Sequence, residues 1–168
     1  LKAAGIPYEE TGNNPEFPCI VAKLGSDEGF SVILNGHLDV VPAGDRSQWD
    51  FDPFCGTVTD KQILGRGTSD MKAGVAGLLF AMKILKESGA ELRGNIRLHL
   101  VSDEESGGEY GSTWLCEHGY AEKADACLIA EPATTLRLAR KADCTSCSRP
   151  RASRPTGAWA ASRAITLF

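Results

Sequence analysis

The 168-residue chain has room for one ordinary domain, and its 42% apolar and 24% charged residues are typical of a soluble globular protein. Its longest apolar stretch, residues 75–82, is interrupted by a glycine and is far shorter than the roughly 20 residues that a membrane span needs. Residues 1–136 hold 11 Lys and Arg against 21 Asp and Glu, which argues against a nucleic-acid-binding core. We therefore expect neither a membrane nor a nucleic-acid partner.

The apolar pattern predicts strands that alternate with helices. In chain order, we expect the end of a helix at residue 1, a buried strand over 30–36, a hairpin over 56–66, a helix over 71–88, a strand over 95–102, a helix over 109–118 and a short buried strand over 126–130. This alternation predicts an α/β fold with a largely parallel, mixed sheet flanked by helices.

The pattern stops near residue 138. Residues 139–168 are basic, rich in Arg, Ser, Ala and Pro, and follow neither a helical nor a strand period. We expect one domain over 1–138 and an atypical basic tail over 139–168 that is disordered or derives from a frame-disrupted reading. The six cysteines are scattered, which indicates reduced thiols in a cytoplasmic protein rather than a disulfide framework.

Acidic residues and one histidine follow the predicted strands at the points where these end. They are His37 and Asp39 after the first strand, Glu104 and Glu105 after the second, Glu131 after the third, and Asp70 ahead of the 71–88 helix. In an open α/β sheet, ligands bind beyond the carboxyl ends of the strands. Carboxylates gathered there would repel one another unless cations neutralised them, and imidazole and oxygen ligands suit Zn²⁺, Mn²⁺ or Co²⁺.

Each of these residues also has a simpler explanation. His37 could be a loop histidine, Asp70 an N-cap of the helix, and Glu131 part of an ordinary loop. Glu104 and Glu105 could be solvated acids in a first helical turn, where the helix dipole favours them. Their occurrence at the same kind of position favours a shared metal site over four separate explanations.

The order and spacing of four motifs also resemble a known family. The motifs are Asn35-Gly-His-Leu-Asp-Val-Val-Pro42, Gly65-Arg-Gly-Thr-Ser-Asp-Met-Lys-Ala-Gly74, Ser102-Asp-Glu-Glu-Ser-Gly-Gly108 and Ala130-Glu-Pro132. Together they resemble the M20 metallopeptidases, which include acetylornithine deacetylase, succinyl-diaminopimelate desuccinylase, aminoacylases and related carboxypeptidases. The resemblance covers residues 1–138, the expected first part of a zinc-peptidase-like catalytic domain.

The resemblance implies two divalent ions, zinc above all and otherwise cobalt or manganese. Their ligands would be His37 and Glu131 for the first ion, Glu105 for the second, and Asp70 as a bridge between them. Asp39 would orient the His37 imidazole, and Glu104 would be the general base that takes a proton from the attacking water. The family also implies a cis peptide bond after Asp70. The substrate would be an N-acyl amino acid or a short peptide.

The chain departs from the family in length. Family members are at least twice as long, and they add a lid domain and a later histidine that completes the second metal site. No histidine follows Glu131 here. We therefore expect an incomplete catalytic domain with little or no activity, and we leave open a homodimer in full-length relatives. The alternative is a non-catalytic remnant or binding protein that keeps the fold without metal.

Overall fold

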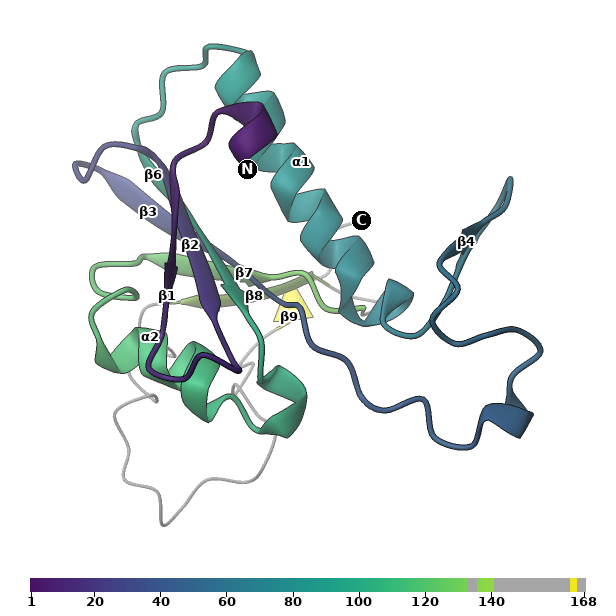
Figure 1. The fold of residues 1–168 in the computed structure, drawn as a ribbon. Coiled ribbons are helices and arrows are strands. Elements are labelled where there is room, and N and C mark those ends of the chain that lie inside the picture. Colours follow the sequence, from purple (N-terminus) through teal and green to yellow (C-terminus); the bar gives the residue numbers. More distant parts are fainter. Residues whose placement is uncertain (133–135, 141–163, 166–168) are drawn as a thin grey trace.

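The computed structural model describes residues 1–132 and the backbone of 136–140 and 164–165, and it shows an α/β fold (Figure 1). One sheet has the strand order β1-β2-β6-β3-β7-β8-β9, and β4 and β5 form a separate hairpin. This confirms a mixed sheet with flanking helices. The strands are β1 (Tyr8–Thr11), β2 (Cys19–Gly25), β3 (Phe30–His37), β4 (Thr57–Val58), β5 (Ile63–Leu64), β6 (Gly94–Val101), β7 (Ala126–Ile129), β8 (Leu136–Arg140) and β9 (Ala164–Ile165).

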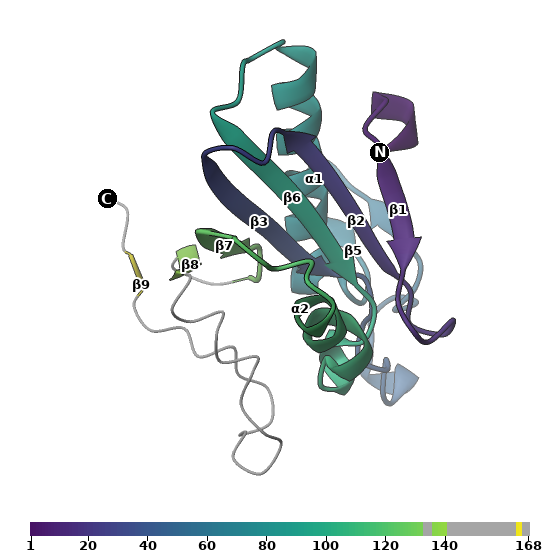
Figure 2. The ribbon, with the colours of Figure 1, turned by 90° about the vertical axis from the view of Figure 1, so that its left-hand side faces the viewer.

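Helices lie on both faces of the sheet. The helix α1 (Ala73–Glu87) covers one face, and the short α2 (Trp114–Glu117) lies against the other (Figures 1 and 2). No helix among the described residues has the length and hydrophobicity needed to cross a membrane. The remaining helical turns are η1 (Lys2–Ala4), η2 (Arg46–Gln48), η3 (Thr68–Lys72), η4 (Glu104–Ser106) and η5 (Glu109–Thr113).

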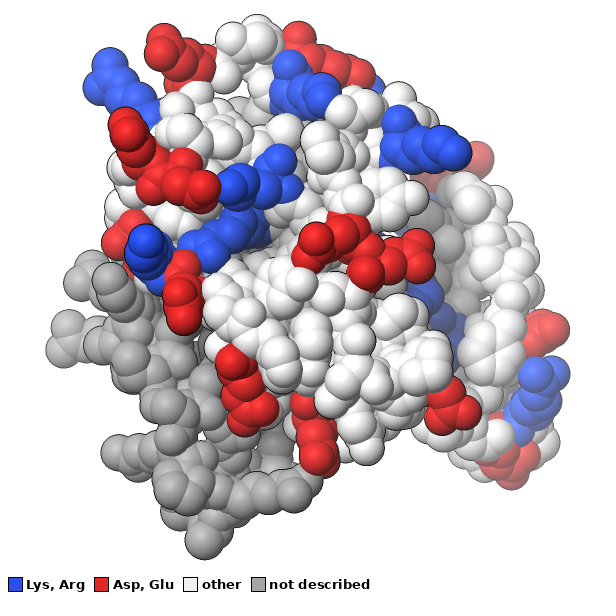
Figure 3. Space-filling view, turned by 60° about the vertical axis from the view of Figure 1, so that its left-hand side comes forward, with Lys and Arg blue, Asp and Glu red and all other residues white. Residues whose placement is uncertain are grey.

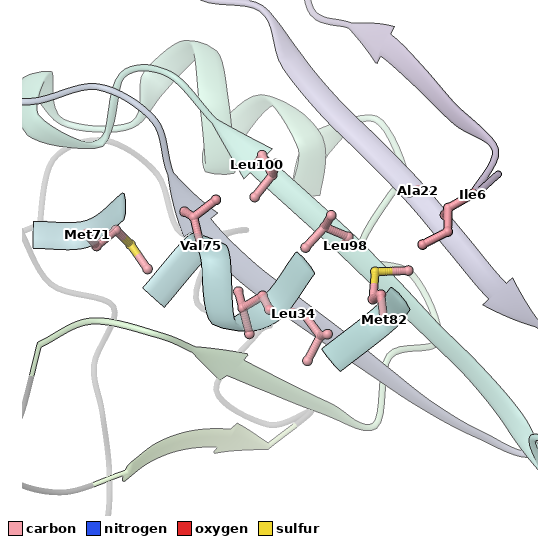
Figure 4. Packing of buried hydrophobic residues seen from close by; sticks show 9 residues of the cluster. Ile6, Ala22, Leu34, Met71, Val75, Met82, Leu98 and Leu100 are labelled. Atoms are coloured by element: carbon pink, nitrogen blue, oxygen red, sulfur yellow. The ribbon is translucent and has the colours of Figure 1, made fainter. Parts of the chain in front are cut away.

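The main core lies between α1 and the sheet. Val75, Leu78 and Met82 follow one face of α1 and pack against strand residues such as Leu34 and Leu98 (Figure 4). Met82 and Leu98 have no exposed surface. Full burial of such a side chain contributes about 1.5–3 kcal/mol, so this contact fixes α1 on the sheet.

The parallel strands bring distant parts of the chain to one edge. β3 runs parallel to both β6 and β7, so the carboxyl ends of all three strands lie at the same edge. His37 pairs with Val101, and the Leu38 N–H donates to the Val101 carbonyl at 2.8 Å. Asn35 pairs with Ile129 in the same way. The residues that follow these strands are therefore neighbours, as the strand pattern predicts.

Two strands near the start of the chain were not expected. β1 pairs antiparallel with β2, and β2 pairs antiparallel with β6. β1 is polar and largely exposed, because it contains Glu9 and Glu10, so its conformation comes from pairing with β2 rather than from an apolar pattern. The other predicted strands, the hairpin and the 71–88 helix are present, although that helix begins only at Ala73. Of the helix expected over 109–118, only Trp114–Glu117 is α-helical, and the helix end expected at the start of the chain is the short turn η1.

The expected tail falls mostly on residues 141–163 and 166–168, which lie outside the described part of the chain. Of the segment 139–168, the structure describes the end of β8, which extends to Arg140, and the backbone of β9. β8 pairs antiparallel with β7, and β9 pairs antiparallel with β8.

On the surface of the described residues, basic and acidic side chains are interspersed on the face that Figure 3 shows.

Candidate metal centre

His37 is the most deeply buried residue of the candidate site. It ends β3, its side chain is 1% exposed, and its Nδ1 and Nε2 lie 3.0 Å from the Asp39 carbonyl oxygen and from Asp70 Oδ1. Gly36 allows this arrangement, since a Cβ at that position would come within 2.9 Å of Val75 Cγ2. The close approach of α1 therefore depends on a glycine directly before the histidine.

Asp70 lies in the turn η3, just ahead of α1. Its backbone and that of Met71 are not helical, and the peptide bond between them is cis, as the family resemblance implied. The side chain of Lys72 donates a hydrogen bond to the Leu38 carbonyl, and Met71 Sδ accepts one from the His37 N–H at 3.2 Å. These contacts hold the segment of Asp70 against β3, with the Asp70 carboxylate beside His37 Nε2.

Glu131 follows β7 and completes a cluster of three possible ligands. Its Oε1 lies 3.4 Å from His37 Nε2. One ligand atom each from His37, Asp70 and Glu131 lies within 4.8 Å of the others, and the three side chains are buried, exposed and half-buried respectively. One nitrogen and two oxygens in this arrangement fit a divalent cation with open positions for further ligands.

The charges of the cluster also favour a cation. Burial is the largest single influence on the pKa of His37, and alone it would lower that pKa. The Asp39 carbonyl and the nearby carboxylates together outweigh burial, so that the pKa of His37 is raised above 6.5. Burial, followed by repulsion from Asp70, raises the pKa of Glu131. Loss of solvent raises the pKa of Glu104 as well, and Glu105, Asp39 and Asp70 add repulsion. A bound cation would relieve this repulsion and compete with protons for the same atoms.

Asp39 connects the histidine to the segment after β6. Its Oδ1 is 3.4 Å from His37 Nδ1, and its Oδ2 accepts a hydrogen bond from the Glu105 N–H at 2.9 Å. Asp39 therefore contacts the imidazole through both its carbonyl oxygen and its carboxylate. Glu104 and Glu105 lie in the exposed turn η4, and the carboxylate of Glu105 is not part of the three-residue cluster.

Asp103 is a residue of this region to which the sequence reasoning gave no role. It is 2% exposed, and its Oδ2 accepts a hydrogen bond from the Tyr110 N–H at 2.6 Å. Its burial could not be recognised from the pattern, because Asp103 looks like one more acid in an acidic turn. The available signal was its place directly after the buried strand β6.

The other two histidines lie elsewhere. His99 is 4% exposed and lines a small cavity on the α2 side of the sheet with Asn35 and Ser112. Burial, with a smaller contribution from Arg97, lowers the pKa of His99 to about 3. His118 stacks on Trp114 with ring centroids 4.1 Å apart. Among the described residues, neither histidine joins the candidate metal centre.

Comparison with known proteins identifies the family. The family model of peptidase family M20/M25/M40 matches residues 33–141. The chain belongs to this family. Its four motifs all lie within the matched residues, so the M20 resemblance is confirmed.

Among curated M20 relatives, the succinyl-diaminopimelate desuccinylase of Rhodospirillum centenum is 38% identical over 137 residues, which are 79% of this chain and 34% of that protein. The N-formyl-4-amino-5-aminomethyl-2-methylpyrimidine deformylase of Bacillus subtilis is 37% identical over 134 residues, which are 78% of this chain and 31% of that protein. The chain thus spans about a third of the length of the curated relatives it matches.

Solved M20 structures have the same fold. The M20 metallo-carboxypeptidase Sso-CP2 of Sulfolobus solfataricus superposes with a TM-score of 0.65 at 27% identity, covering 77% of this chain and 29% of that one. Human carnosine dipeptidase 1 superposes with a TM-score of 0.61 at 28% identity, covering 76% and 30%. Both similarities support the fold class expected from the sequence.

Proposed function

We propose that this chain carries part of the active site of a metal-dependent hydrolase that cleaves the amide bond of N-acyl amino acids or short peptides. The observation that carries the proposal is the convergence of His37, Asp70 and Glu131, which come from three separate elements. The names of the M20 relatives, a desuccinylase and a dipeptidase among them, support this substrate class.

We propose that two divalent ions, most simply zinc, bind at and beside this cluster. His37 and Glu131 would hold the first ion, Glu105 the second, and Asp70 would bridge them. Asp39 would fix the tautomer and orientation of the imidazole, as its contact with Nδ1 suggests. When bound, the ions would supply the Lewis acidity that polarises the scissile carbonyl and activates water near neutral pH.

We propose Glu104 as the general base. Its carboxylate interacts with His37 and Asp70, and its raised pKa brings it closer to the neutral range in which a base works well. Glu104 would accept the proton of the attacking water and deliver it to the amine as the carbon–nitrogen bond breaks. The products would be a carboxylate and an amine.

The second ion would be held less completely than the first. Glu105 lies outside the three-residue cluster, and His99 and His118 are placed elsewhere in the described structure. We therefore propose that the 168 residues bind one ion more strongly than the other and have little or no activity by themselves.

Because Cys19 and Cys55 are free thiols, a reducing compartment such as the cytoplasm is the expected location.

The test is the zinc content of the purified chain, compared with Asp70→Ala and with Asp60→Ala. Asp60 is an exposed acid between β4 and β5, outside the cluster, and serves as the control. We expect zinc in the parent and in Asp60→Ala, and its loss in Asp70→Ala. Absence of zinc from the parent would overturn the proposed metal centre and support a non-catalytic remnant. Zinc-dependent hydrolysis of N-succinyl-diaminopimelate or a dipeptide would overturn the proposed inactivity.

A further inference from the structure

A buried carboxylate joins the turn after β6 to the segment that follows it. Asp103 is 2% exposed, its Oδ2 accepts from the Tyr110 N–H at 2.6 Å, and its carbonyl oxygen accepts from the N–H groups of Ser106 and Gly108 at 3.1 and 2.8 Å. A carboxylate removed from water in this way is unfavourable unless hydrogen bonds compensate for the lost solvation. The main chain of Asp103 thus closes the turn η4, and its carboxylate joins this turn to Tyr110 in η5.

The space around this carboxylate depends on a glycine. A Cβ at Gly111 would lie 2.3 Å from Asp103 Oδ1 and 2.8 Å from Val101 Cβ. These contacts leave no room for a larger group beside Asp103. The side chain is thus confined between β6 and η5 rather than free to turn toward the cluster of possible ligands.

A short series of contacts leads from Asp103 to the candidate metal centre. The turn that its carboxylate joins to Tyr110 contains Glu105, whose N–H donates to Asp39 Oδ2 at 2.9 Å. Asp39 Oδ1 in turn lies 3.4 Å from His37 Nδ1. A shift of the turn would move the Asp39 carboxylate and, through it, change the orientation of the His37 imidazole.

We propose that Asp103 is a positioning residue of the metal centre, which sets the turn that carries Glu104 and Glu105 and thereby the orientation of His37. This inference rests on the proposed function, since it assigns Asp103 a role in metal binding. Asp103 itself is neither a ligand nor the base. A change at Asp103 should therefore weaken metal binding although every ligand remains.

The experiment compares Asp103→Ala with Asp125→Ala. Asp125 is a matched control, because its Oδ2 also accepts from a backbone N–H, that of Ser31, at 2.9 Å. Ser31 lies near the opposite end of β3, about 20 Å from His37 at ~3.3 Å per residue. Two quantities are measured: zinc affinity by competition with a chromophoric chelator, and amide hydrogen exchange at Glu105 in the metal-free chain.

We expect Asp103→Ala to bind zinc about tenfold more weakly than the parent, as is typical for residues that support metal ligands. The Glu105 amide should exchange faster in Asp103→Ala, and Asp125→Ala should leave both quantities unchanged. Asp103→Asn keeps an oxygen that can accept from Tyr110, so it should restore much of the zinc affinity.

The outcomes separate the two proposals. If the parent binds no zinc, the proposed metal centre fails, and the exchange rate at Glu105 still tests Asp103. If the parent binds zinc and Asp103→Ala matches it in affinity, or if the Glu105 amide exchanges at the parent rate, the positioning role is wrong. If Asp103→Ala does not fold, Gly111→Ala is the second variant, because its added Cβ would push the Asp103 carboxylate out of its place. We expect the same weaker zinc binding and faster exchange of the Glu105 amide in this variant.

Discussion

The approach of α1 to β7 permits a sharp test of how the candidate metal centre is built. Gly74 lies in the first turn of α1, and a Cβ at this position would be 2.0 Å from the Ala130 carbonyl oxygen. Cβ atoms essentially never come within 3.0 Å of such an atom, so Gly74→Ala must separate the two segments by about 1 Å. Asp70 precedes α1 and Glu131 follows Ala130, so the separation moves two possible ligands apart.

The magnitude follows from the tolerance of metal sites. Metal–ligand distances vary by only about 0.2 Å, whereas the displacement is about 1 Å. We expect Gly74→Ala to lower zinc affinity by about 10- to 100-fold and stability by about 1–3 kcal/mol. The assays are chelator competition for zinc and thermal unfolding of the metal-free chain.

Gly77→Ala provides the matched control on the same helix. A Cβ at Gly77 meets no atom within 4 Å, so alanine there removes only the poor helix propensity of glycine and should stabilise the chain by about 1 kcal/mol. Its zinc affinity should equal that of the parent. The reasoning is refuted if Gly74→Ala keeps the parent affinity, or if Gly77→Ala loses affinity to the same extent.

Acid should destabilise the chain through His99, whose pKa is about 3 in the folded state and about 6.5 in the unfolded state. As the pH falls from 6.5 to 5, the unfolded chain takes up a proton at this histidine and the folded chain does not. The free energy of unfolding therefore decreases by about 2 kcal/mol, and His99→Leu should remove this decrease in denaturant titrations. Zinc affinity should rise with pH through and above 6.5, because protons compete at His37, whose pKa is raised; a flat profile in chelator titrations would contradict this. Phe80 and Ile84 are each 62% exposed on α1, so Phe80→Glu with Ile84→Glu should reduce self-association in sedimentation experiments without lowering thermal stability.

The sequence predicts the centre of this fold better than its edges. β3, β6 and β7 are continuous apolar or alternating segments, and each is followed by acidic residues, so both the strands and the edge where they end could be predicted. β1 could not, since its residues carry no apolar pattern and their conformation depends on the distant pairing with β2. The region 139–168 stays a prediction for all residues outside the described structure.

The candidate site shows the same division. The meeting of three ligands could be predicted. His37 and Glu131 lie at the ends of neighbouring parallel strands, and Asp70 precedes the helix that covers those strands. The burial of Asp103 and the contact of Gly74 with Ala130 could not be predicted, because both depend on packing between segments that are far apart in sequence. The roles assigned to Glu104 and Glu105 remain predictions.

The parallel pairing of β3 with β7 also orders the events of folding. The hydrogen bond between Ser31 and Asp125, which lies at the start of this pairing, joins residues 94 positions apart, and His37 and Asp70 are 33 positions apart. Contacts across such long loops form late, after the entropy of closing the loops has been lost. Glu131 can therefore join His37 only after β3 and β7 have paired. A zinc ion bound by all three possible ligands would stabilise the folded state selectively, by about 2.7 kcal/mol at a hundredfold excess over its dissociation constant. Its uptake would follow the pairing of β3 with β7 rather than precede it.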